Sequence, residues 1–113
     1  MSSRKIITVV TAITGDRVIV TDEAIKHVIE QHFRGIPQDL VLETLEKVLK
    51  DPSDIYKDTQ HKDKEYDFFY RLDDGKFVVA IVKIKKDGAY LSSMYPTGTK
   101  QRAKHKGFKK VKV

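Results

Sequence analysis

Two of the four histidines lie in one segment whose apolar spacing predicts a helix, and histidine is the side chain best suited to moving protons near neutral pH. His27 and His32 stand five positions apart, so they diverge by about 140° around a helix. They cannot bind one metal ion together, and the sequence has neither cysteine nor an HExxH motif. We therefore expect no metal site and consider each histidine as a general base or acid.

Each histidine also has a structural interpretation. His32 falls in the apolar stripe of its helix, which is equally typical of a core histidine bonded to a backbone carbonyl. His27 falls on the other side of the helix, where solvent is the default, although a substrate at a sheet edge could reach it. His61 lies in a polar segment and is expected to be solvated, whereas His105 lies in a basic segment and is expected to contact phosphate.

Hydroxyl groups are dense in residues 92–99 (SSMYPTGT). If this segment is a strand, Ser93, Tyr95 and Thr97 alternate onto one face. Hydroxyls beside a cation can bind a phosphate, and a tyrosine can stack on a base. The competing interpretation is the polar face of an ordinary edge strand.

Three cations belong to strands expected beside that segment. Lys83 and Lys85 share one face of a strand, and Arg71 ends the strand before it. Together with Ser93 they would form a concave basic patch. Solvent-facing lysine is the alternative, and we prefer it for Lys85, because Lys83 lies nearer to the apolar run 77–82.

These residue types are sufficient for RNA cleavage. A base takes the proton of the 2′-hydroxyl, an acid protonates the leaving 5′-oxygen, and cations stabilise the charged phosphorane. DNA lacks the 2′-hydroxyl, so this inventory favours RNA. The chain has no glycine-rich phosphate loop, which argues against nucleotide hydrolysis and dinucleotide binding.

Positive charge is concentrated at the C-terminal end. The net charge is +6, and residues 88–113 contain seven of the 22 basic residues and none of the 16 acidic ones. Such asymmetry predicts binding to a polyanion, although a basic tail that only aids solubility is the alternative. The residues expected to hold flanking RNA are Lys26, Thr97, Lys100, Arg102 and Lys104.

The N-terminal half predicts β-structure followed by two helices. Residues 5–10 (KIITVV) and 17–20 (RVIV) are β-branched runs that form either a hairpin or one interrupted strand. Thr21 is suited to cap a helix that ends at Gly35. A second helix is expected between a cap at Asp39 and the Asp51-Pro52 pair, and the short loop predicts that the two helices are antiparallel.

The C-terminal half predicts an antiparallel meander. Residues 66–72, 76–85 and 89–95 read as strands, joined by hairpin turns at Asp73-Asp74-Gly75 and Asp87-Gly88. The run 77–82 is apolar at every position, which is typical of a central strand covered on both faces, or covered on one face and functional on the other. The expected architecture is one sheet with both helices on one face.

Length and composition predict one domain. We expect an α+β domain at residues 1–100 and a basic C-terminal extension at 101–113. The sequence shows no signal segment and no apolar run that could span a membrane, so we expect a cytoplasmic protein that does not act at a membrane.

The pattern resembles the barnase–EndoU–colicin–RelE (BECR) superfamily of metal-independent RNases, especially its phage-associated and toxin-like branches. The resemblance covers residues 18–100 and is carried by segments 24–32 and 49–55 and by Ser-Met-Tyr-Pro at 93–96 followed by Lys100. Lys26 with His27, and Ser93 with Tyr95, are similar to the Lys/His and Ser-x-aromatic elements of the colicin-like branch. His32 is similar to the histidine that closes the helix in phage-associated members.

The resemblance implies two N-terminal helices packed on one face of a four-stranded, mainly antiparallel sheet, as in RelE and colicin D. It implies a metal-independent endoribonuclease of toxin or phage type that needs no cofactor. His32 or His27 would transfer protons, Lys26, Arg71 and Lys83 would stabilise phosphate charge, and the hydroxyl strand would position it. A non-catalytic RNA-binding protein is the alternative. An acidic inhibitor or antitoxin protein would be a further partner.

Overall fold

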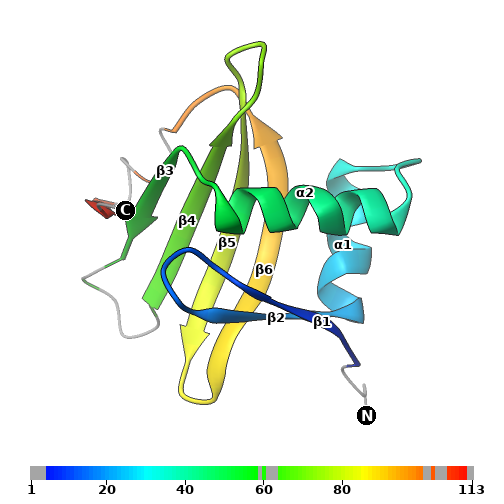
Figure 1. Ribbon diagram of the computed structural model, residues 1–113, viewed down its shortest axis with the longest axis horizontal. Coiled ribbons are helices and arrows are strands. Elements are labelled where there is room, and N and C mark those ends of the chain that lie inside the picture. Colours follow the sequence, from blue (N-terminus) through cyan, green and yellow to red (C-terminus); the bar gives the residue numbers. More distant parts are fainter. Residues whose placement is uncertain (1–4, 59, 61–63, 101–102, 104–106, 112–113) are drawn as a thin grey trace.

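Seven strands form one sheet in the part of the chain that the computed structural model describes, which is residues 5–58, 60, 64–100, 103 and 107–111 (Figure 1). The strands are β1 (Ile6–Thr11), β2 (Arg17–Thr21), β3 (Asp54–Lys57), β4 (Lys64–Arg71), β5 (Phe77–Lys85), β6 (Gly88–Thr97) and β7 (Lys109–Val111). Their order across the sheet is β1-β2-β6-β5-β4-β3-β7. Neighbours are antiparallel except β2 and β6, which pair in parallel at Val18–Ala89 and Ile19–Tyr90.

This mixed sheet shows that the expected four-stranded sheet behind two N-terminal helices was wrong. The two N-terminal β-branched runs form a hairpin, and β2 joins that hairpin to the sheet beside β6. At the other end, β3 and β7 extend the sheet beyond β4. Strand β3 was not predicted, because its four residues are too few to show the alternation of apolar and polar side chains that marks a strand.

Helix α1 (Asp22–His32) begins directly where β2 ends. The backbone N–H of Ala24 donates to Thr21 Oγ1 at 3.2 Å, so the predicted cap is confirmed. The helix ends at His32, before the expected Gly35, which lies in the following loop with a φ of +83°. α1 therefore has a fixed starting point at the end of a sheet strand.

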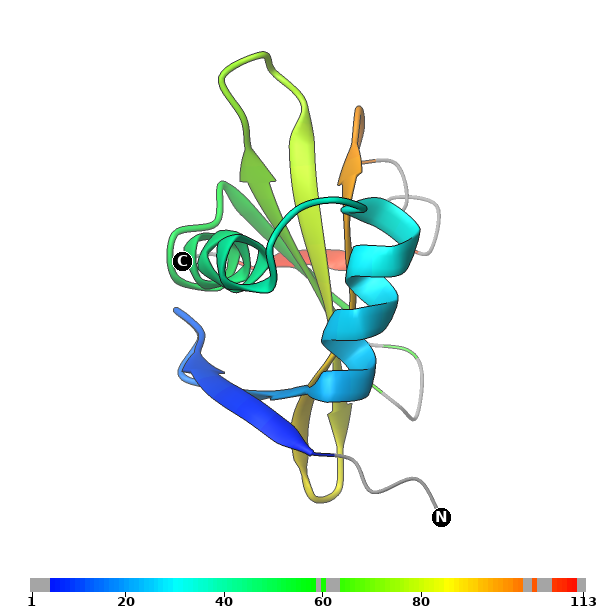
Figure 2. The ribbon, with the colours of Figure 1, turned by 90° about the vertical axis from the view of Figure 1, so that its right-hand side faces the viewer.

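Helix α2 (Gln38–Lys50) covers one face of the sheet. It begins after Pro37 without a side-chain cap, so Asp39 lies in the first turn rather than capping it. Its buried stripe consists of Val41, Leu45, Val48 and Leu49. The expected antiparallel helix pair is not formed, because α2 crosses the sheet while α1 runs alongside β6 (Figures 1 and 2). Neither of these helices is long and apolar enough to cross a membrane.

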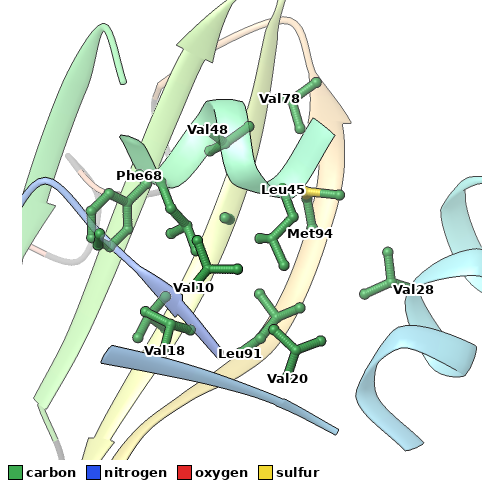
Figure 3. Close-up of a cluster of buried hydrophobic side chains, with 14 of the residues drawn as sticks. Val10, Val18, Val20, Val28, Leu45, Val48, Phe68, Val78, Leu91 and Met94 are labelled. Carbon is green, nitrogen blue, oxygen red and sulfur yellow. The ribbon is translucent and has the colours of Figure 1, made fainter. Parts of the chain in front are cut away.

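The larger core lies between α2, the β1–β2 hairpin and the face of the sheet that they cover (Figure 3). Phe68, Leu45 and Met94 are among its fully buried side chains. Val28 brings α1 into the same core. Because residues from four separate segments meet here, the position of α1 beside β6 is set by packing as well as by the chain connection.

A smaller core lies on the opposite face. Phe69, Val79 and Ile81 pack there with Ala103 and Phe108 from the C-terminal segment. Alternate residues of β5 therefore enter different cores, which explains the continuous apolar run 77–82. Beyond this run the same face carries Lys83 and Lys85, so apolar cover is replaced by charge toward the end of β5.

Asp54 holds the C-terminal segment against the sheet. Its carboxylate contacts Lys100 Nζ at 2.8 Å and Lys110 Nζ at 3.0 Å. Partial burial alone would raise the pKa of Asp54, but hydrogen bonds and charge from the two lysines together lower it below its ordinary value. The contact with Asp54 raises the pKa of Lys110. Part of the basic end is therefore integrated into the fold.

Replacing Asp54 should destabilise the protein in a pH-dependent way. A carboxyl group with a lowered folded pKa contributes its full stability above its ordinary pKa of 3.8 and loses it as the pH falls through the folded pKa. Asp54→Asn should therefore lower the free energy of unfolding by roughly 1–3 kcal/mol at pH 7, and the difference should shrink below about pH 4. Urea denaturation at several pH values measures this, with the exposed Asp73→Asn as control. A difference that is independent of pH would contradict the assignment.

Candidate functional site

A hollow of about 320 Å³ lies between the first half of α1 and the neighbouring ends of β5 and β6. Its polar wall consists of Thr21, Glu23 and His27 from the β2–α1 segment, Lys83 and Lys85 from β5, and Tyr90 and Ser92 from β6. We call it the His27 pocket. Three separate chain segments thus bring a proton-transfer group, a carboxylate, two cations and three hydroxyl-bearing side chains to one place.

Local geometry explains why these side chains converge. Glu23 and His27 are four residues apart and so lie on one side of α1. Lys83 and Lys85 share a face of β5, and Lys83 is paired with Tyr90 across the β5–β6 ladder. The two strands meet in a tight hairpin, so this pairing is fixed by the turn.

A β-bulge shapes the pocket wall. Ile81 pairs with Ser93, but Val82 pairs with Leu91, so Ser92 is an extra residue in β6. Ser92 is exposed and lines the pocket. The bulge therefore places a hydroxyl at the pocket that a regular strand would have directed elsewhere.

Lys83 is held by a buried carboxylate. Glu65 lies opposite Lys83 in the β4–β5 ladder, and Glu65 Oε1 is 2.8 Å from Lys83 Nζ. The side chain of Glu65 is 3% exposed and that of Lys83 is 40% exposed. Burial of the carboxylate is costly without a cation beside it, so Lys83 stabilises Glu65 and is in turn fixed at the pocket with part of its charge neutralised.

Lys85 and Tyr90 form the other side of the cationic wall. Lys85 Nζ lies 5.6 Å from the centroid of the Tyr90 ring. The Tyr90 hydroxyl donates to Asp87 Oδ2 at 2.8 Å. The ring is thereby oriented, and Lys85 presents its charge at the pocket without a carboxylate partner as close as that of Lys83.

His32 lies outside this pocket, beside a different residue of β6. Its ring centroid is 5.2 Å from that of Tyr95, with an angle of 37° between the ring planes. His32 is exposed, so it is not a core histidine. The two histidines of α1 thus face different parts of β6.

The remaining predicted residues are distributed along the sheet. Ser93, Tyr95 and Thr97 share one face, opposite Ile81, Val79 and Phe77 respectively. The Thr97 hydroxyl is engaged in a local turn with Thr99. Arg71 lies opposite Phe77, which is six positions from Lys83 along β5, or about 20 Å. Arg71 lines a separate hollow of about 240 Å³ and therefore does not join the His27 pocket.

The described members of the predicted RNA-binding set, Lys26, Thr97 and Lys100, do not line the His27 pocket. Lys26 is exposed on α1 and does not line the His27 pocket. Lys100 is engaged with Asp54 and also lies 5.6 Å from the centroid of the Phe77 ring. Arg102 and Lys104, like His61 and His105, lie outside the described residues. Within the described residues there is also no group of three His, Cys, Asp or Glu side chains suited to a metal ion.

Sequence reasoning missed several pocket residues. Lys85 was expected to face solvent, and Glu23, Tyr90 and Ser92 were not singled out. The Asp87-Gly88 turn fixes the hairpin register, so pairing of Lys83 with Tyr90 was open to prediction from turn chemistry. Ser92 depends on the bulge, for which the sequence carries no clear signal.

Comparison with known proteins identifies one family. A family model described as phage-Barnase-EndoU-ColicinE5/D-RelE like nuclease 3 matches residues 3–104. No curated protein and no solved structure matches the chain. The family match confirms the superfamily and the phage-associated branch that the sequence pattern resembled.

The two pocket lysines should differ in their effect on stability. Lys83→Ala removes the cation beside the buried Glu65 carboxylate and should lower the free energy of unfolding by about 2–3 kcal/mol. Lys85→Ala should cost at most about 1 kcal/mol, since it removes an exposed cation–π contact. Urea denaturation of the two variants measures the difference. The double variant Lys83→Met/Glu65→Leu should recover much of the loss, and equal stability of the two single variants would disprove the structural role of Lys83.

Proposed function

Because the chain belongs to the phage-Barnase-EndoU-ColicinE5/D-RelE like nuclease 3 family, we propose that it is a metal-independent endoribonuclease of phage or toxin type. The observation that carries this proposal is the His27 pocket, where one histidine lies with Lys83 and Lys85. The family match supports nuclease function in general. The choice of RNA and the mechanism rest on the chemistry of the pocket.

His27 is the proton-transfer group of the proposed reaction. It is exposed, and it projects from α1 into the pocket. As general base it takes the proton of a 2′-hydroxyl, whose oxygen attacks the adjacent phosphorus. As general acid it protonates the leaving 5′-oxygen. Positioned acid–base catalysis of this kind contributes typically 10²–10⁴-fold to a rate.

The lysines of β5 balance the charge of the phosphate as it develops. Lys85 is the principal phosphate contact, because Lys83 already interacts with Glu65 at 2.8 Å. Lys83 adds a fixed positive end to the pocket wall. Ser92 and Tyr90 offer hydroxyl and ring surface for the sugar and base of the bound nucleotide.

The chemistry of the pocket favours RNA over DNA. The nucleophile in the proposed reaction is the substrate's own 2′-hydroxyl, which a histidine can activate directly. The same nucleophile is absent from DNA. A single-stranded DNA should therefore bind to the cations of the pocket and remain intact.

Cleavage of RNA in the presence of EDTA tests the proposal. The wild-type protein should cleave total RNA, and His27→Ala should reduce the rate by about 10²–10⁴-fold. Lys85→Ala should also slow cleavage, whereas Lys86→Ala, which removes an exposed lysine next in sequence that does not line the pocket, should not. An oligonucleotide with one 2′-deoxy substitution at the cleaved position should resist cleavage there.

The controls separate cleavage from binding. If the wild type cleaves RNA no faster than the His27→Ala/His32→Ala double variant, the enzymatic proposal fails. If RNA binding nevertheless falls steeply with salt and is equal in the wild type and in the single variant His27→Ala, the chain is a non-catalytic RNA-binding protein. Binding that does not depend on salt would rule out both functions.

A further inference from the structure

We propose that His32 and Tyr95 form a stacking subsite for one unpaired nucleobase of a strand whose phosphate lies in the His27 pocket. The inference rests on the proposed function, and it assigns the substrate as single-stranded. It also gives His32 a role in binding, in place of proton transfer.

The two rings form a platform with one rigid and one accessible member. Tyr95 lies on β6 opposite Val79 and packs against the smaller core. His32 is exposed at the end of α1, with its ring centroid 5.2 Å from that of Tyr95. The two ring planes are tilted by 37°, so the rings are in contact but do not form a parallel, face-to-face stack. An exposed aromatic ring of this kind presents the surface on which bases stack.

The subsite offers the ring surfaces of His32 and Tyr95. A nucleobase has a flat π-face that can lie on such a ring, so a base is the part of a nucleotide suited to this place. Every base has a π-face, so stacking here tolerates any sequence.

The distance from the His27 pocket gives the length of the substrate. His27 and His32 are separated by five residues of helix, a rise of about 7.5 Å. Along β5, the position opposite Tyr95 is four residues from Lys83, or about 13 Å. Stacked nucleotides advance by about 3.4 Å each. At this spacing the stacked base is about two to four nucleotides from the phosphate in the pocket.

The substrate must also be single-stranded at this point. In a duplex both faces of a base are covered by its neighbours, and an aromatic side chain cannot stack on them without unpairing. Unpaired bases in loops and ends can turn outward to such a ring. A duplex of the same sequence should therefore lose the contribution of the subsite.

Binding of two probes that cannot be cleaved tests the subsite independently of catalysis. One is a single-stranded hexathymidylate of deoxynucleotides, and the other is an abasic deoxyribose hexamer with the same phosphates. By fluorescence anisotropy, the wild type should bind the base-bearing probe roughly 5- to 150-fold more tightly. His32→Ala and Tyr95→Leu should lose most of this preference, whereas Tyr95→Phe should keep it.

Two controls make the outcome specific. Tyr70→Leu changes a half-buried tyrosine packed on the larger core, so it should keep the wild-type preference. Lys85→Ala should weaken both probes by the same factor. Equal binding of both probes by the wild type, or a preference that survives in folded His32→Ala, would overturn the subsite even if RNA is cleaved. A preference lost in His32→Ala supports it even if cleavage fails.

Discussion

The short parallel pairing between β2 and β6 is the constraint on which the site depends. It consists of two residue pairs, Val18–Ala89 and Ile19–Tyr90. Because α1 follows β2 without a loop and is capped by Thr21, this pairing fixes where the helix begins and sends it along β6. His27 then meets the start of β6, and His32 meets Tyr95 near its end. A hairpin attached by a flexible loop would leave both histidines without a defined partner.

The face of the sheet that carries the smaller core changes from apolar to positively charged along β5. Val79 and Ile81 are covered by the smaller core, whereas Lys83 and Lys85 lie at the pocket. Glu65 and Asp67 are buried near this boundary on β4. Buried carboxylates require partners that hold them in place, and for Glu65 one of these is Lys83. Lys83 thus has a structural role, because it stabilises the buried Glu65 carboxylate. Lys85 lies at the same pocket without that role.

The sequence predicted those features of the fold that a single short segment determines. The Thr21 cap, the apolar stripe of α2 and the two-sided burial of β5 follow from chemistry within each element. The family could also be recognised from short motifs. The parallel pairing of β2 was not predictable, because it depends on contacts between segments about 70 residues apart in the sequence. The separation of Arg71 from Lys83 was open to prediction, because the Asp73-Asp74-Gly75 turn fixes the β4–β5 register and places Arg71 opposite Phe77, six positions from Lys83.

The placement of β7 has a consequence at the edge of the sheet. An edge strand presents unpaired backbone groups that can template another strand, and short length and lysine side chains are common ways to discourage this. β7 has three residues, two of which are Lys109 and Lys110. Charges that would attract nucleic acid thus also repel the edge of a second sheet. The lysines of β7 thus protect the open edge of the sheet, and a substitution of either should be examined for aggregation.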